Sequence, residues 1–213
     1  MNIQHKEIIK LGKHNGFNKF MKRSFDILVS FIGLIITSPI ILASVILVRV
    51  LYGESGFFTQ KRVGKNGKKF RIVKIRTMNS KVKFDTNVTT DKDPRITKLG
   101  RVFRKTKIDE LPQLFNVLVG DMSFVGPRPD VEETINNIKD ENKKNIFLSI
   151  RPGITGPASI KYKNEEEILS KVDNSEIYNK EIIFPDKVNL NKEYIENYSF
   201  SMDIKYIINT IIG

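Results

Sequence analysis

An acidic pair, Asp109-Glu110, follows a dense run of basic residues, and this combination is the one best suited to chemistry in the chain. The run consists of Arg95, Lys98, Arg101, Arg104, Lys105 and Lys107. Carboxylate oxygens are ligands that Mg²⁺ prefers, and nearby cations neutralise phosphate charge. A carboxylate can also act as a nucleophile toward phosphorus. We therefore take Asp109 and Glu110 as candidate catalytic residues acting on a Mg²⁺-bound diphosphate.

The backbone decides whether this pair can act together. Adjacent residues in a regular helix point about 100° apart, so the two carboxylates converge only at a helix start or a distortion. Pro112 favours such a distortion. A simpler interpretation also stands. Thr106-x-x-Asp109 resembles a capping box, in which acidic residues of the first turn only stabilise a helix.

Four further cations are candidates to bind substrate phosphates: Lys74, Arg95, Arg104 and Arg128. Arg128 lies between Pro127 and Pro129, and a rigidly held guanidinium is a good phosphate clamp. Three of these four residues have a simpler alternative. Arg128 could be a surface residue in a stiff turn, Asp93-Pro94-Arg95 could be an Asx turn, and Lys74 could face solvent from a strand.

The composition narrows the chemistry. The 213 residues include no cysteine and two histidines, His5 and His14, which excludes thiolate metal sites and disfavours histidine-based centres. The net charge is +12, and residues 49–107 carry eighteen basic and four acidic side chains. A basic half of this kind indicates a polyanionic partner: nucleic acid, an anionic membrane face or a phosphate-rich substrate.

Residues 27–48 form an uncharged apolar run of bilayer length, about 33 Å as a helix. Basic residues flank both ends, whereas a spanning helix is expected to show an asymmetry. Ser38-Pro39 lies near the middle, where proline removes a backbone donor and Ser38 could satisfy a freed carbonyl. The residues alone leave two arrangements open: a spanning helix, or a re-entrant helix broken at Ser38-Pro39.

The remaining sequence predicts mostly helices and one hairpin. Residues 57–63 and 70–75 are expected to form strands around the Gly64–Gly67 turn. A helical pattern covers 96–119 with a break at Leu111-Pro112, and 120–129 and 151–157 are rigid Gly/Pro loops. Polar helices are expected over 131–148 and 164–180, with a loop over 79–95. The C-terminal isoleucines predict an amphipathic helix on the membrane or the core.

Taken in order, these segments resemble the bacterial sugar transferase family, the monotopic phosphoglycosyl transferases in their short form. The resemblance is carried by KRSFD at 22–26, Ser38-Pro39, QKRVG at 60–64, KIRTM at 74–78, DPRIT at 93–97, the long block at 105–129 (KTKIDELPQLFNVLVGDMSFVGPRP), RPGITG at 151–156 and NYS at 197–199. It covers about residues 20–213. One departure is Pro157-Ala158-Ser159, where many relatives have a hydrophobic residue followed by Ala-Gln.

The resemblance implies a specific reaction. Asp109 would attack the sugar-bearing phosphorus of a UDP-sugar, release UMP and form an aspartyl phosphosugar. Polyprenyl phosphate, usually undecaprenyl phosphate, would then accept the sugar phosphate. By the same match Glu110 is associated with Mg²⁺, Arg128 binds phosphate, and the helix is re-entrant with both ends in the bacterial cytoplasm. The product would enter a surface glycan such as a capsule, O-antigen or exopolysaccharide.

We therefore expect an α+β, mostly helical fold with three parts. These are a basic tail (1–21), a re-entrant membrane helix (22–52) and a cytoplasmic catalytic domain (53–213) with a small hairpin and surface amphipathic helices. The expected partners are a UDP-sugar, polyprenyl phosphate and membrane lipid, and a homodimer is left open. The alternative is a basic membrane-surface or nucleic-acid-binding protein without catalysis. No recognition helix, zinc module or aromatic RNA-binding strand set supports nucleic acid as a partner.

Overall fold

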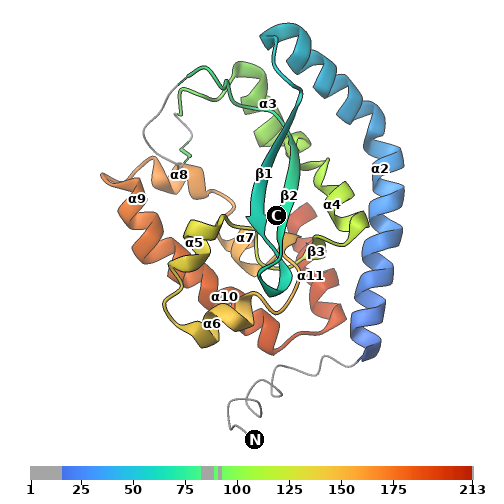
Figure 1. The fold of residues 1–213 in the computed structure, drawn as a ribbon, viewed down its shortest axis with the longest axis vertical. Coiled ribbons are helices and arrows are strands. Elements are labelled where there is room, and N and C mark those ends of the chain that lie inside the picture. The colour runs from blue at the N-terminus through green and yellow to red at the C-terminus, as the bar shows by residue number, and fades with distance from the viewer. Residues whose placement is uncertain (1–15, 83–88, 91–92, 213) are drawn as a thin grey trace, which may run out of the picture.

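The computed structural model describes residues 16–212 except 83–88 and 91–92, and shows one long helix lying along a domain of short helices and two small sheets (Figure 1). The fold is a mostly helical α+β structure, as expected. Its α-helices are α2 (Gly16–Tyr52), α3 (Lys98–Thr106), α4 (Gln113–Val119), α5 (Glu132–Asn136), α6 (Glu141–Phe147), α7 (Pro157–Lys161), α8 (Glu165–Leu169), α9 (Ser175–Tyr178), α10 (Phe184–Glu196) and α11 (Phe200–Ile212). Short 3-10 turns form η2 (Lys65–Gly67) and η3 (Ile108–Glu110), and a π-turn forms η4 (Asn179–Ile183).

The helix α2 is long and apolar enough to cross a membrane, and most of its hydrophobic side chains are exposed. Only its Asp26, Ser30, Ser44 and Val48 are buried, all on the side that meets the domain. The helix begins at Gly16, so residues 16–21, expected in the tail, are helical. Residues 1–15, which include His5 and His14, lie outside the described part of the chain. The exposed surface indicates a membrane protein.

Helical structure continues through Ser38-Pro39, so α2 is not interrupted at the expected break. Figure 1 shows instead that the helix curves toward its C-terminal end. Pro39 cannot donate to the carbonyl of Ile35, four residues earlier, and the hydroxyl of Ser38 donates to that oxygen at 2.9 Å. This replacement bond explains why the helix tolerates the proline. The side of the membrane on which each end lies stays a prediction.

The predicted hairpin is confirmed. Strands β1 (Phe57–Val63) and β2 (Lys69–Ile75) pair antiparallel around η2, where Asn66 and Gly67 adopt positive φ angles of 55° and 75°. A second, parallel pair joins β3 (Ser123–Val125) to β4 (Gly153–Thr155). The sequence predicts loops for both of these segments, because three-residue strands rich in Gly and Pro carry no periodic signal.

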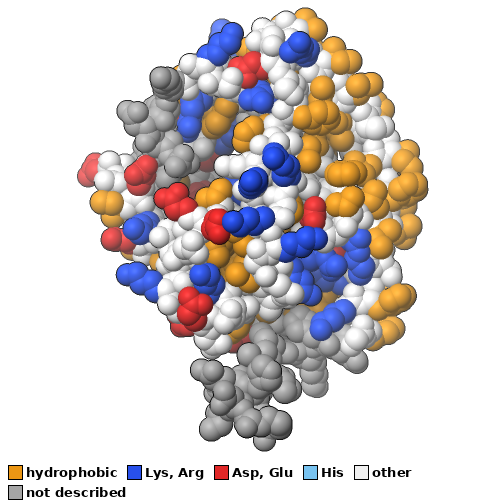
Figure 2. All heavy atoms as spheres, viewed as in Figure 1, with side chains coloured by type: hydrophobic (Ala, Val, Ile, Leu, Met, Phe, Trp, Pro, Cys, Tyr) orange, Lys and Arg blue, Asp and Glu red, His pale blue; other side chains and the backbone are white. Residues whose placement is uncertain are grey.

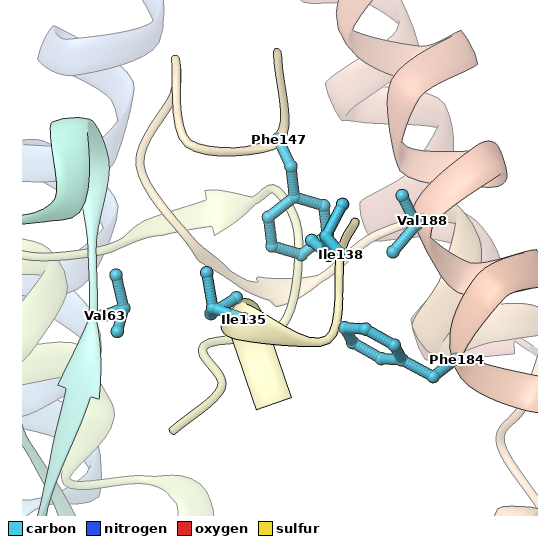
Figure 3. Packing of buried hydrophobic residues seen from close by; sticks show 6 residues of the cluster. All are labelled: Val63, Ile135, Ile138, Phe147, Phe184 and Val188. Atoms are coloured by element: carbon cyan, nitrogen blue, oxygen red, sulfur yellow. The ribbon is translucent and has the colours of Figure 1, made fainter. Parts of the chain in front are cut away.

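The core of the domain is divided among several clusters. In one of them, Val63 of the hairpin, Ile135 and Ile138, Phe147, and Phe184 and Val188 of α10 point toward one another (Figure 3). Another joins Val48 of α2 to Ile75 of β2 and Phe103 of α3. Apolar packing therefore fixes both the hairpin and the membrane helix to the helical domain.

Two expected helices are each divided in the structure. The segment 131–148 forms α5 and α6, and Asp140 caps α6 by accepting from the amides of Asn142 and Lys143. The segment 164–180 forms α8 and α9, followed by α10, which the sequence analysis did not anticipate. An N-cap residue inside a polar helical pattern starts a new helix. The amphipathic helix at the C-terminus is confirmed as α11, with Ile208, Ile211 and Ile212 exposed.

Candidate active site

The acidic pair lies on a sharp corner between α3 and α4. Helix α3 ends at Lys107, which adopts the left-handed conformation with φ 58°, and the 3-10 turn η3 carries Asp109 and Glu110 before Pro112 starts the next helix. The expected break in this region is confirmed. Because η3 is neither a continuation of α3 nor the first turn of α4, it can direct both carboxylates inward.

A buried asparagine fixes this corner to the hairpin. Asn116 of α4 accepts from the backbone N–H of Val73 at 3.0 Å and donates to the carbonyl of Arg71 at 2.8 Å, so its amide pairs with the free edge of β2. Lys74 lies on the same strand, one residue after Val73. Its Nζ donates to Oε1 of Glu110 at 3.0 Å. Lys74 is therefore part of the site and not a solvated strand residue.

Arg128 reaches the same carboxylate from two crossed loops. Its Nη2 donates to Oε1 of Glu110 at 2.8 Å. The loop before it packs backbone to backbone on the Gly153 loop, where a Cβ added at Gly153 would lie 2.1 Å from the nitrogen of Gly126. Pro127 and Pro129 restrict the residues on each side of the arginine. The crossing therefore holds the guanidinium in place although its side chain is 46% exposed.

Glu110 is the anionic centre of the site. Its side chain is 13% exposed and lies between Lys74 and Arg128. Burial alone would raise the pKa of Glu110, but the charges and hydrogen bonds of Arg128 and Lys74 hold that pKa far below its usual range. The pKa of Lys74 is lowered because burial outweighs the attraction of Glu110. Glu110 is thus ionised at any physiological pH.

Asp109 is buried and has an oxygen without a hydrogen-bond partner in the described part of the chain. The residue is 6% exposed, and among the described residues no group hydrogen-bonds its Oδ1. Burial raises the pKa of Asp109, and Lys74, Arg104 and Lys107 oppose that rise. The capping box is not formed, since Thr106 donates to the carbonyl of Val102 and no side chain caps η3. A buried carboxylate without a structural partner is a candidate for function.

The other two predicted phosphate-binding residues are engaged elsewhere. Arg104 pairs with Glu166 of α8, while its charge still acts on Asp109. Arg95 binds the buried Asp93 through two hydrogen bonds from Nε and one of 2.6 Å from Nη2. The amide of Arg95 also donates to Asp93, which is the Asx turn named as the simpler interpretation. A phosphate-binding role for these two arginines stays a prediction.

Three polar residues at this site were not singled out from the sequence. Gln113, one turn after the acidic pair, is 2% exposed, and its Nε2 has no partner among the described residues. Arg62 donates to the carbonyl of Pro129, next to Arg128. Burial raises the pKa of the adjacent Asp130, which Lys187 and Arg62 counteract. Arg62 and Asp130 reach the site only through tertiary contacts, and no local pattern indicates them. Gln113 is near the pair in the chain, but its burial is not visible in the sequence.

The donor set fits a bound Mg²⁺. Asp109 and Glu110 could supply oxygen ligands, and the unpartnered Oδ1 of Asp109 is an available one. Among the described residues no cluster of three or more His, Cys, Asp or Glu side chains could hold a metal by itself. Mg²⁺ usually binds through one or two carboxylates together with water and substrate phosphates. Two carboxylates beside Lys74 and Arg128 match that coordination.

The exposed apolar helix and the acidic pair among cations define a class: a membrane-associated protein with a site suited to phosphoryl transfer. Comparison with known families identifies the particular family within this class. A model of the family described as bacterial sugar transferase matches residues 17–213, and the chain belongs to this family.

Several of the relatives that it matches carry transferase names. It is 35% identical to a UDP-N-acetylgalactosamine-undecaprenyl-phosphate N-acetylgalactosaminephosphotransferase of Aeromonas hydrophila, over 90% of this chain and 43% of that protein. It is 33% identical to the UDP-glucose:undecaprenyl-phosphate glucose-1-phosphate transferase of Escherichia coli, over 92% of this chain and 40% of that protein. The chain is 37% identical to the uncharacterized sugar transferase EpsL of Bacillus subtilis, over 90% of this chain and 85% of that protein. The chain thus spans less than half the length of the first two of these relatives.

Proposed function

We propose that this protein transfers a sugar phosphate from a UDP-sugar to polyprenyl phosphate, such as undecaprenyl phosphate, and releases UMP. The observation that carries the proposal is Asp109, a buried carboxylate with an unpartnered oxygen, next to a glutamate that holds two cations. The family and the names of the relatives support the same reaction class.

In the proposed first step, a carboxylate oxygen of Asp109 attacks the phosphorus that bears the sugar. The bond from this phosphorus to the bridging oxygen of the diphosphate breaks, and UMP leaves with that oxygen. The cations near Asp109 favour its ionised, nucleophilic form against the cost of burial. Arg128 and Lys74 face the same space and would neutralise charge on the transferred phosphoryl group.

In the second step, an oxygen of polyprenyl phosphate attacks the phosphorus of the aspartyl phosphosugar. The lipid diphosphate sugar forms, and the carboxylate of Asp109 is regenerated. A Mg²⁺ ion held by Glu110 and Asp109 would supply electrostatic stabilisation of the diphosphate. Since a two-step exchange of this kind needs one nucleophile and one phosphate site, a single acidic pair is sufficient.

We further propose that both ends of α2 lie on one, cytoplasmic, side of the inner membrane. Near its start, Nζ of Lys22 donates to the carbonyl of Val125 and to Asp203. Near its end, Val48 packs on Ile75 and Phe103. One folded domain therefore contacts both ends of the helix. This supports placing both ends on the same side, because a folded domain does not occupy both faces of a bilayer.

The experiment for the reaction compares Asp109→Asn with the wild type. UMP release from a panel of UDP-sugars with added polyprenyl phosphate should be abolished by the substitution, while the circular-dichroism spectrum and membrane association stay unchanged. The wild type also identifies its sugar in this panel. Full turnover by Asp109→Asn would remove Asp109 as the nucleophile.

The experiment for topology uses the absence of native cysteine. Gly16→Cys and Ser55→Cys are exposed positions on either side of the apolar run. Both should react with an impermeant maleimide only in inverted vesicles, which expose the cytoplasmic face. Labelling of the two positions from opposite faces would mean that α2 spans the membrane.

A further inference from the structure

Four basic side chains meet at the N-terminal part of α2, away from the acidic pair. We call Lys19, Arg23, Lys65 and Arg151 the cationic rim. They come from α2, the turn of the hairpin and the start of the RPGITG loop. None of them takes part in the proposed reaction, so their convergence needs a separate explanation.

Backbone contacts bring these four residues together. Arg23 donates to the carbonyls of Val117 and Leu118 at 2.7 and 2.8 Å, and Nε of Arg151 donates to the carbonyl of Gly120 at 2.7 Å. Both guanidiniums thus meet at the C-terminal end of α4.

The two lysines join the same group. Lys19 precedes Arg23 by one helical turn and shares its face of α2. The amide of Asn66, next to Lys65, donates to the carbonyl of Leu148, which places the hairpin turn on the segment that leads to Arg151.

Among the described residues the four cations of the rim form no ion pair, although the charge of the buried Asp26 acts on Arg23. No carboxylate of the described chain lies within 4.0 Å of any of the four cations, although twelve such ion pairs occur elsewhere in it. Burial together with the repulsion of Arg151 and Lys19 lowers the pKa of Lys65. The two arginines use three of their ten N–H groups on these carbonyls, which leaves donors for an anion.

The rim borders the apolar surface of the protein. Phe20, next to Lys19, is 68% exposed, and Val119, next to Gly120, is 52% exposed. Figure 2 shows Lys and Arg side chains gathered beside the hydrophobic strip over α2. Aromatic and aliphatic groups that enter a bilayer place neighbouring cations at the level of the lipid phosphates.

We propose that the cationic rim binds the phosphate of an anionic phospholipid headgroup, such as that of phosphatidylglycerol. The net positive charge of the four side chains supplies the attraction, and the remaining guanidinium donors match phosphate oxygens. The exposed Phe20 and Val119 would contact the acyl chains of the same lipid. This inference depends on α2 lying in a bilayer and does not depend on the chemistry at Asp109.

The test measures lipid binding to the full chain in a neutral detergent by native mass spectrometry. Phosphatidylglycerol and phosphatidylcholine with identical acyl chains are added separately. The variant is Lys19→Gln/Lys65→Gln, since both lysines are exposed and neither ammonium takes part in an ion pair. The matched control is Lys139→Gln/Lys180→Gln, which removes the same charge from exposed lysines in the loop after α5 and in η4.

The wild type should bind phosphatidylglycerol more tightly than phosphatidylcholine. The Lys19/Lys65 variant should lose roughly fivefold in phosphatidylglycerol affinity for each cation removed, and the control should lose none. UMP release with polyprenyl phosphate, assayed without phosphatidylglycerol, should stay unchanged in both variants.

Three results would overturn the inference: equal affinity for the two lipids, unaltered phosphatidylglycerol affinity in the Lys19/Lys65 variant, or loss of UMP release in that variant. The last result would mean that the rim holds the polyprenyl phosphate acceptor instead. A silent Asp109→Asn would refute the proposed reaction while leaving the lipid measurements unaffected, so the two failures are distinguishable.

Discussion

Replacing Gly153 with alanine should impair the active site without touching any of its side chains. A Cβ at this position would lie 2.1 Å from the nitrogen of Gly126 and 2.6 Å from the carbonyl of Thr155, whereas ordinary contacts begin at 3.4 Å. Both obstacles are backbone atoms, so the two loops must separate by about 1 Å. Arg128 is two residues beyond Gly126 and would move with its loop.

The substitution should change two quantities, the melting temperature and the turnover rate. Forcing a carbon into packed backbone typically costs about 2 kcal/mol, which for a chain of this size lowers the melting temperature by about 4–8 °C. A 1 Å displacement of a positioning group costs roughly 100-fold in rate. Turnover should therefore fall roughly 100-fold at a temperature where the variant is still folded.

The assay is UMP release at saturating UDP-sugar and polyprenyl phosphate, with the melting temperature followed by circular dichroism. The control is Gly16→Ala, since a Cβ there meets nothing within 4 Å. If Gly153→Ala turned over within twofold of the wild type, the crossing of the two loops would not be what positions Arg128. An equal loss in Gly16→Ala would point to a general effect of substitution.

Three other predictions concern single interactions. Because the charge of Lys74 opposes the rise in the pKa of Asp109, Lys74→Met should raise that pKa further. Activity needs ionised Asp109 and is lost as pH falls through its pKa, so the acidic limb of the pH–rate profile should move to higher pH. An unmoved acidic limb would contradict the role of Asp109. EDTA should abolish UMP release and added Mg²⁺ should restore it without change in the circular-dichroism spectrum; undiminished rates in EDTA would exclude the metal. Lys22→Met leaves the buried Asp203 without its 2.6 Å ion-pair partner and should lower the free energy of unfolding by about 3 kcal/mol. The control Lys19→Met should lower it by almost nothing, so equal melting temperatures for the two variants would contradict the role of this ion pair.

Much of the fold could be predicted where the signal is local. The hairpin follows from β-branched and aromatic residues around a Gly/Asn turn, and the membrane helix follows from an apolar run of bilayer length. The break before α4 follows from the chemistry of proline. The divided segments 131–148 and 164–180 could not be predicted as such, because polar residues at helical spacing look alike on both sides of a cap.

The sequence by itself determined the chemical type of the site: an acidic pair, a basic field, an arginine between prolines and a helix that prefers lipid. These depend on residue identity and on spacing along the chain. Only the tertiary structure decided which cations meet the pair. Lys74 and Arg128 bind Glu110 from segments 36 and 18 residues away, while Arg95 turns to its own neighbour Asp93. The physical reason is that charge is visible in a sequence, but the pairing of charges depends on burial and backbone crossing, which segments far apart in the chain create together.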